Sequence, residues 1–132
     1  MREIKFRAKE IGSEGKWRVG DLHITATKPH IHSLSNKYLI KIETIGQFTG
    51  LCDINSKEIY EGDIIKSSHG TIHYIVYDNN LACFKAVVAR YNPLGEYSTL
   101  SKGWVVQFNK EVIGNIHDNP ELLETKVILK SL

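Results

Sequence analysis

The side chains of this 132-residue chain with the clearest capacity for chemistry are carboxylates gathered in one segment. Glu61 and Asp63 are two positions apart, so in an extended chain both point to the same side, about 6.6 Å apart. Together with Asp53, Glu58 or Glu43 they could hold a divalent metal ion, as in a nuclease. A turn aspartate beside a solvated glutamate is the commoner role of such residues, and it is the interpretation we favour.

The histidines are the second candidate group. His30 and His32 would share one face of a strand, a spacing that can bind zinc. Nothing in the spacing selects a third ligand among His23, His69, His73 and His117. We therefore predict no metal site.

Nucleophilic chemistry has little support. Cys52 and Cys83 form no C-x-x-C pair, which fits a reducing cytoplasm, and we expect both to be small buried hydrophobic residues. The chain contains neither a G-x-S-x-G elbow nor a P-loop. The sequence predicts a protein that is not an enzyme, with no catalytic residues and no cofactor.

The N-terminal third is basic. Residues 1–41 have a formal charge of +5 and residues 42–132 have −3, for a total of +2. If residues 3–9 pair with residues 16–19, we expect alternation to put one apolar set on one face: Ile4, Phe6, Ala8, Trp17 and Val19. The opposite face would then hold the five cations Lys5, Arg7, Lys9, Lys16 and Arg18. Such a face could follow the phosphates of a nucleic acid, or it could be a solvated face whose lysines discourage strand aggregation.

Apolar residues recur with a period of two through most of the chain, which predicts half-buried strands. Three such runs are Tyr38-Ile40-Ile42, Ile72-Tyr74-Val76 and Trp104-Val106-Phe108. Residues 81–89 are apolar almost throughout, so we expect a strand covered on both faces. Turn residues separate these runs at short intervals, which predicts a small all-β antiparallel barrel or sandwich.

Two further segments complete the expected fold. Asn119, Pro120 and Glu121 resemble a helix start, and they predict a short C-terminal helical turn. Residues 91–102 are the longest weakly patterned stretch, and they predict a mobile loop.

The segment from Gly46 to Ile65, GQFTGLCDINSKEIYEGDII, resembles the signature of the YopX family of small phage and prophage proteins. The opening MREIKFRA and the later stretches VIGNI and NPELL resemble the family's start and close. Lys9 and Ser56 depart from the family pattern, where many relatives have tryptophan and glycine. The resemblance implies an all-β fold with a small barrel-like core and a phage setting, and it implies no activity.

The signature is explained by turn building. We expect a strand from Phe48 to Asp53, a reversal over residues 54–57 and a partner strand over residues 58–60. Residues 61–64 then look like the diverging turn of an SH3-like barrel, where a glycine supplies unusual backbone angles and a carboxylate accepts N–H groups. The structural positions are Gly50, Asp53, Asn55, Tyr60, Gly62, Asp63, Gly114 and Asn115.

The sequence therefore predicts one domain over residues 1–132 that works by binding in the cytoplasm of a bacterial host cell. An unknown protein partner, or self-association through exposed strand edges, is the favoured interpretation. Nucleic-acid binding through the basic hairpin is the alternative, and a metal-dependent nuclease around Asp53, Glu61 and Asp63 is the lesser one. No apolar stretch is long enough to span a membrane, and the first residues lack the apolar core of a signal peptide.

Overall fold

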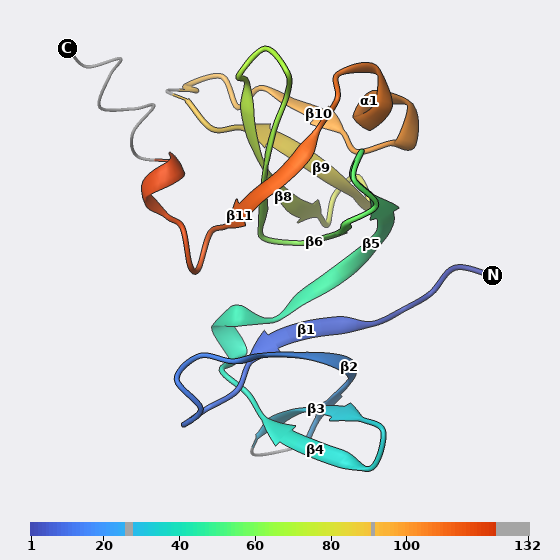
Figure 1. Ribbon diagram of the computed structural model, residues 1–132, viewed down its shortest axis with the longest axis vertical. Helices are drawn as coiled ribbons and strands as arrows, with labels where there is room; N and C mark the ends of the chain where they lie inside the picture. Colours follow the sequence, from blue (N-terminus) through green and yellow to red (C-terminus); the bar gives the residue numbers. More distant parts are fainter. Residues whose placement is uncertain (26–27, 91, 124–132) are drawn as a thin grey trace. The chain divides into compact units, whose positions relative to one another are not determined.

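The structure is a computed structural model that describes residues 1–25, 28–90 and 92–123 (Figure 1). The chain forms two compact units, Met1–Gly50 and Leu51–Leu132. Both are built from antiparallel strands, so the predicted all-β class is confirmed, although in the described ranges neither sheet closes into a barrel. The single domain predicted over residues 1–132 stays a prediction beside this division into two units. No helix among the described residues is long and apolar enough to cross a membrane.

Short antiparallel strands make up the N-terminal unit. They are β1 (Phe6–Lys9), β2 (Trp17–Ile24), β3 (Pro29–Ser33), β4 (Asn36–Leu39) and β5 (Gly46–Cys52), which runs on into the second unit. Their order in the sheet is β4-β3-β2-β1-β5, and the 3-10 turn η1 (Ile42–Thr44) precedes β5. Neighbours in the sheet are mostly neighbours in sequence, as expected for hairpins joined by short turns.

The sheet of this unit curls over its own apolar side. Glu10, just after β1, forms a bridge with Ile40, just after β4. The amide of Ile11 donates to the carbonyl of Leu39 at 2.9 Å, and the amide of Lys41 donates to that of Lys9 at 2.9 Å. The enclosed core consists of Ala8, Ile31 and Ile40, with Phe6, Leu22, Tyr38 and Ile45 packed against it.

The C-terminal unit begins with the end of β5 and its hairpin partner β6 (Glu58–Tyr60). Five further strands follow: β7 (Asp63–Lys66), β8 (Ile72–Asp78), β9 (Cys83–Val88), β10 (Tyr97–Thr99) and β11 (Glu111–Asn115). They form a sheet in the order β10-β9-β8-β7-β11. The core of this unit consists of Ile59, Ile65, Ile75, Ala86, Leu100 and Val105. The predicted strands around residues 48–52 and 58–60 and the predicted strand within residues 81–89 are all present.

One predicted strand is wrong. The run Trp104-Val106-Phe108 lies in and just after the helix α1 (Lys102–Gln107). Ser101 caps this helix, because its hydroxyl accepts a hydrogen bond from the Trp104 amide at 3.2 Å. The adjacent residues Trp104 and Val105 are half-buried and buried, whereas Val106 and Phe108 are exposed, so the buried side does not follow the predicted alternation.

Three smaller predictions have different outcomes. Ile42 leaves the strand pattern, because it lies in η1 and is exposed. Within the stretch predicted to be a mobile loop, residues 97–99 form β10 and pair with β9, and Tyr91 lies outside the described residues. Residues 121–123 are helical, which confirms the predicted C-terminal turn.

Candidate functional site

The register between β1 and β2 decides which side chains share a face. Phe6 is opposite Gly20, and Ala8 is opposite Arg18. Directly opposed residues of an antiparallel pair lie on the same face. Trp17 and Val19 therefore share a face with the β1 cations and not with the apolar residues of β1. The prediction that the hairpin has one apolar face and one face of five cations is wrong.

The reason is the length of the connection. The amide of Glu10 donates to the carbonyl of Lys16 at 2.8 Å, so five residues join the two ends of the hairpin. An odd number of connecting residues puts positions of equal parity on the same side, whereas the predicted arrangement required an even number. Lys16 and Arg18 consequently lie on the opposite side of the sheet from Lys5, Arg7 and Lys9. The five cations do not form one face.

The same register logic extends across the unit. His23 of β2 is opposite His30 of β3, and His32 of β3 is opposite Lys37 of β4. The side of the sheet away from the core, called here the outer face, consists of Lys5, Arg7, Lys9, Trp17, Val19, Asp21, His23, His30, His32, Lys37 and Leu39. With neutral histidines its formal charge is +3, because four cations accompany one carboxylate.

The cations of the outer face lie over aromatic rings. The guanidinium carbon of Arg7 is 4.8 Å from the centre of the Trp17 ring, and the Lys9 Nζ is 5.6 Å from it. The Lys5 Nζ is 4.9 Å from the Phe48 ring and 3.2 Å from a carboxylate oxygen of Glu3. These contacts order three positive groups along β1.

The histidines form a stack beside them. The rings of His23 and His32 are parallel within 14° at a centroid distance of 3.8 Å, and His30 meets His32 edge-on at 6.4 Å. Desolvation, and then the positive charges that His23, Lys37 and His30 present, lower the pKa of His32, while Asp21 opposes that effect. This ring cluster was expected only as a pair of possible zinc ligands.

Of the two cations on the opposite side of the hairpin, Arg18 is neutralised by an ion pair. The Arg18 Nε lies 2.6 Å from a carboxylate oxygen of Glu10, and its guanidinium lies 4.0 Å over the Tyr38 ring. Arg18 therefore covers one end of the core. It lies on the side of the sheet opposite the outer face.

The signature residues build turns in the C-terminal unit, as the structural interpretation predicted. One Asp53 oxygen accepts from the amides of Asn55 and Lys57 at 2.8 and 2.9 Å, and the other accepts from Val112 at 2.8 Å. Ser56 has a φ of +65°, a left-handed backbone conformation that favours glycine.

The second turn of the signature uses Gly62 and Asp63. Gly62 has a φ of +93°, and the buried Asp63 carboxylate accepts from the Tyr60 amide at 2.7 Å. The Tyr60 hydroxyl lies 3.2 Å from a Glu58 oxygen. Both the backbone angle and the carboxylate cap match the predicted turn.

The other signature positions act near the ends of β5 and β11. A Cβ on Gly114 would lie 2.5 Å from the Asn119 Oδ1, so a larger residue there would displace the side chain that accepts from the Asn115 amide. The Asn115 Oδ1 accepts from the amides of His117 and Asp118 at 3.0 and 2.9 Å. The remaining position, Gly50, has a φ of +87°.

The candidate metal ligands are not assembled. No three histidine, cysteine, aspartate or glutamate side chains within residues 1–25, 28–90 and 92–123 are grouped where they could hold a metal ion. Asp53, Glu61 and Asp63 therefore form no such group. Cys52 is exposed and Cys83 is half-buried, so the prediction that both are buried is wrong.

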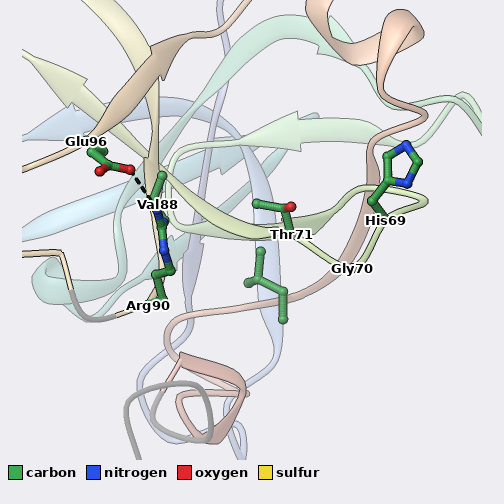
Figure 2. A pocket seen from close by; sticks show the side chains of 7 residues that line it. His69, Gly70, Thr71, Val88, Arg90 and Glu96 are labelled. Carbon is green, nitrogen blue, oxygen red and sulfur yellow. Dashed lines mark hydrogen bonds and ion pairs between the residues drawn. The ribbon is translucent and has the colours of Figure 1, made fainter. Parts of the chain in front are cut away.

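A pocket of about 370 Å³ lies at one end of the sheet in the C-terminal unit (Figure 2). Arg90 and Glu96 stand at one side of it and are joined by an ion pair of 2.8 Å, with His69 at the opposite side. Because this ion pair cancels the charge of the one arginine in the lining, the pocket offers an ionic ligand little attraction.

A buried basic cluster in the same unit was missed by sequence reasoning. Lys110 is 2% exposed and its Nζ lies 3.4 Å from the Nδ1 of His73, which is 5% exposed. The same Nζ lies 4.4 Å over the Trp104 ring and 5.8 Å over that of Phe108. Burial lowers the pKa of Lys110, and burial followed by Lys110 and Arg90 lowers the pKa of His73 to about 4. The alternation of apolar residues predicted one face with Ile72, Tyr74 and Val76. It gave no indication that His73, on the opposite face of the strand, is buried.

Fold and site together define a small all-β protein with a basic, ring-rich sheet face in one unit and a turn-building signature in the other. The chain belongs to the YopX protein family, whose model matches residues 5–124. Protein EF1440 from Enterococcus faecalis has a similar fold in its crystal structure, with 23% sequence identity and a TM-score of 0.57. That match covers 93% of this chain and 99% of the other. Comparison with curated proteins finds no match.

Proposed function

We propose that this protein acts by binding and not by catalysis, and that the outer face of the N-terminal unit takes a nucleic acid. The observation that supports the proposal is the placement of three β1 cations on the same sheet face as Trp17 and three histidines, opposite the apolar core. The strongest alternative role of cations on a sheet is to keep a solvated face from aggregating, and that role does not require ordered contacts with rings.

The chemistry of the outer face suits a phosphate backbone. Lysine and arginine side chains neutralise phosphates and release their counterions, which supplies much of the affinity of nucleic-acid binding. Arg7 and Lys9 are held over Trp17, so less side-chain freedom is lost when they meet a phosphate. The nearby carboxylates Glu3 and Asp21 weaken the positive field.

Protein binding or self-association is the second candidate function. An apolar groove of about 570 Å³ lies beside β4 and η1, with Ile11 and Ile42 both strongly exposed. Lys28 and Lys41 are among its lining residues. Exposed apolar side chains beside the last strand of a sheet are suited to an extended peptide or a second copy of the chain.

The biological setting is part of the proposal. The resemblance described for the signature implies a phage or prophage protein. We propose that it works in the cytoplasm of a bacterial host.

The test is a fluorescence-anisotropy titration of labelled DNA and RNA at several salt concentrations. Neutralisation of about four phosphates predicts a log–log salt slope near −3.6 on duplex DNA or about −2.8 on a single strand. Arg7→Ala should weaken binding and flatten the slope by nearly one unit. Lys16→Ala is the matched control, because it removes one exposed positive charge from the opposite side of the same hairpin.

Two outcomes would contradict nucleic-acid binding. One is the absence of any anisotropy change at tens of micromolar protein in 50 mM salt. The other is an equal loss of affinity in Arg7→Ala and Lys16→Ala, which would show that the outer face is not the contact surface. Binding that fails with nucleic acid while the protein forms dimers in sedimentation would favour the second candidate.

A further inference from the structure

Among the described residues the two sheets end in four strands, β4 and β6 in one and β10 and β11 in the other. The last strand of a sheet presents backbone N–H and C=O groups that another chain can pair with, unless the protein covers them. β4 is covered at one end, because the Leu39 carbonyl accepts from the Ile11 amide at 2.9 Å. The other position of β4 that faces away from β3 is Lys37, a residue type that discourages strand pairing.

Side chains cover the edges of β6 and β11. The Tyr60 amide of β6 donates to the Asp63 carboxylate at 2.7 Å. In β11 the Val112 amide donates to an Asp53 oxygen at 2.8 Å, and the Asn115 amide donates to an oxygen of the Asn119 side chain at 3.2 Å. Three of the four last strands therefore have protected edges.

The edge of β10 has no such protection. The Glu96 carbonyl and the Leu100 amide form hydrogen bonds of 3.1 Å with backbone groups of β9. Alternate residues of an antiparallel strand face the neighbouring strand, so Tyr97 and Thr99 point their N–H and C=O groups away from β9. Within residues 1–25, 28–90 and 92–123 these groups have no hydrogen-bond partner.

We propose that β10 pairs with β10 of a second copy of this chain, antiparallel across a two-fold axis at Ser98. In this register Tyr97 of each copy lies opposite Thr99 of the other, and each such pair exchanges two backbone hydrogen bonds. The four outward N–H groups and four outward C=O groups of the two strands are then all paired. A register centred on Tyr97 or on Thr99 would place the other of these two residues opposite Gly95 or Ser101, outside β10.

The side chains of this edge suit a second copy. The exposed side chains of Tyr97 and Thr99 lie on one side of the sheet, opposite Val87 and Lys85 of β9. An aromatic residue opposite a β-branched residue is a favourable cross-strand pair, and the two-fold axis creates this pair twice. Pairing joins the two five-stranded sheets of the C-terminal units into one continuous sheet.

The charges at the two ends of β10 are complementary. Glu96 directly precedes the strand, and Lys102 begins α1 three residues after it, and both are exposed. Antiparallel pairing brings the start of β10 in one copy beside its end in the other. The carboxylate of each copy therefore approaches the ammonium of its partner, whereas parallel pairing would bring like charges together.

This inference does not depend on the proposed function. β10 belongs to the C-terminal unit, whereas both the outer face and the apolar groove beside β4 belong to the N-terminal unit. Because the paired strands are short, the interface is small and we expect a weak, concentration-dependent dimer.

The test is analytical ultracentrifugation of the full chain from about 5 to 500 μM. We expect the average mass to rise from 15.0 kDa toward twice that value. Thr99→Pro removes an amide that faces away from β9, so it leaves the ladder within the chain intact and removes two of the four bonds between copies. This variant should weaken dimerisation at least about tenfold.

Matched variants separate backbone pairing from side-chain and charge effects. Thr99→Ala keeps the amide and should weaken the dimer less than about threefold. Lys102→Glu should weaken it about two- to tenfold, whereas Lys57→Glu, the same charge change in the turn before β6, should leave it unchanged. If circular dichroism shows that Thr99→Pro does not fold, Thr99→Lys replaces it, because a lysine at this position protects the edge as Lys37 does in β4.

The outcomes distinguish this inference from the proposed function. A mass of one chain at the highest concentration would overturn it and leave nucleic-acid binding untouched. A dimer of unchanged affinity in folded Thr99→Pro would also overturn it, and would assign self-association to another surface such as the groove beside β4. Equal effects of Lys102→Glu and Lys57→Glu would overturn the antiparallel arrangement. Dimerisation that Thr99→Pro abolishes, in a protein that does not bind nucleic acid, would support this inference alone.

Discussion

Each unit of this protein places a lysine ammonium over a tryptophan ring, but only the C-terminal unit buries the lysine and adds a histidine to the contact. On the outer face, the Lys9 Nζ lies 5.6 Å from the centre of the Trp17 ring, and both residues are half-buried. In the C-terminal unit, Lys110 lies 4.4 Å over Trp104 and contacts His73, and both basic residues are almost completely buried. In both units a lysine ammonium contacts a tryptophan ring. The two contacts therefore differ mainly in how far the lysine is exposed to water.

That difference decides what each cluster can do. On the outer face the cations are half-buried or exposed, so they keep contact with water as well as with the rings. In the interior, the contacts of Lys110 are His73 Nδ1 and the rings of Trp104 and Phe108, and no ion pair within the described chain neutralises its charge. Burial of a charged group without a counter-ion is costly, so burial lowers the pKa of both Lys110 and His73, and the charges of Lys110 and Arg90 lower that of His73 further. We interpret the inner cluster as structural and the outer one as a binding surface.

The largest expected effect is at Lys110. Lys110→Ala removes a packed side chain and should lower the free energy of unfolding by about 2–4 kcal/mol. Lys9→Ala removes the equivalent contact at the surface and should cost less than about 1 kcal/mol. Urea unfolding followed by circular dichroism measures both.

Lys110→Met is the matched variant for the buried charge. It keeps the length of the side chain and removes the ammonium, so stability should change by less than about 1 kcal/mol or should increase. A loss as large as that of Lys110→Ala would show that the buried charge itself stabilises the unit, contrary to this interpretation.

The pH dependence of stability is the next largest effect. The pKa of His73 is about 4 in the folded state against 6.5 for the unfolded chain, so between these values the unfolded state binds more protons. The full contribution of His73 is therefore present above about pH 6.5 and is lost as the pH falls through 4, by up to about 3 kcal/mol. Urea unfolding at pH 7, 5.5 and 4 measures this loss, and His73→Gln should reduce the slope. An unchanged slope in that variant would assign the effect to other groups.

The carboxylates allow a similar comparison between interior and surface. Asp53 accepts three backbone hydrogen bonds, so Asp53→Ala should cost about 2 kcal/mol because those amides lose their acceptor. Asp21→Ala on the outer face should change stability by less than about 0.5 kcal/mol. Thermal unfolding of the two variants provides the measurement. If Asp53→Ala melted like the unmodified protein, the turn-building account of the signature would be wrong.

The smallest expected effect on stability is at Lys37, which is exposed on the outer face. Lys37→Ala should leave the unfolding free energy within about 0.5 kcal/mol and should reduce the single-strand salt slope by about 0.7. Anisotropy titrations at three salt concentrations measure the slope. A change in stability without a change in slope would place Lys37 outside the contact surface.

The sequence alone determined the features that depend on neighbouring residues. The hairpin around residues 46–60, the turn at Gly62 and Asp63 and the short helical turn after Asn119 follow from turn chemistry, which acts over a few positions. Family membership was visible for the same reason, because the distinctive residues build local turns.

Only the tertiary structure decided which residues meet across strands and which are buried. A five-residue connection between Glu10 and Lys16 put Trp17 on the face of Arg7, and alternation within each strand contains no information about that register. The helix at Trp104 replaced a predicted strand because Ser101 caps it and Val105 packs into the core. His73 and Lys110 are 37 positions apart, and packing of separate elements brings them together, so no local pattern predicts their contact or the loss of water around it.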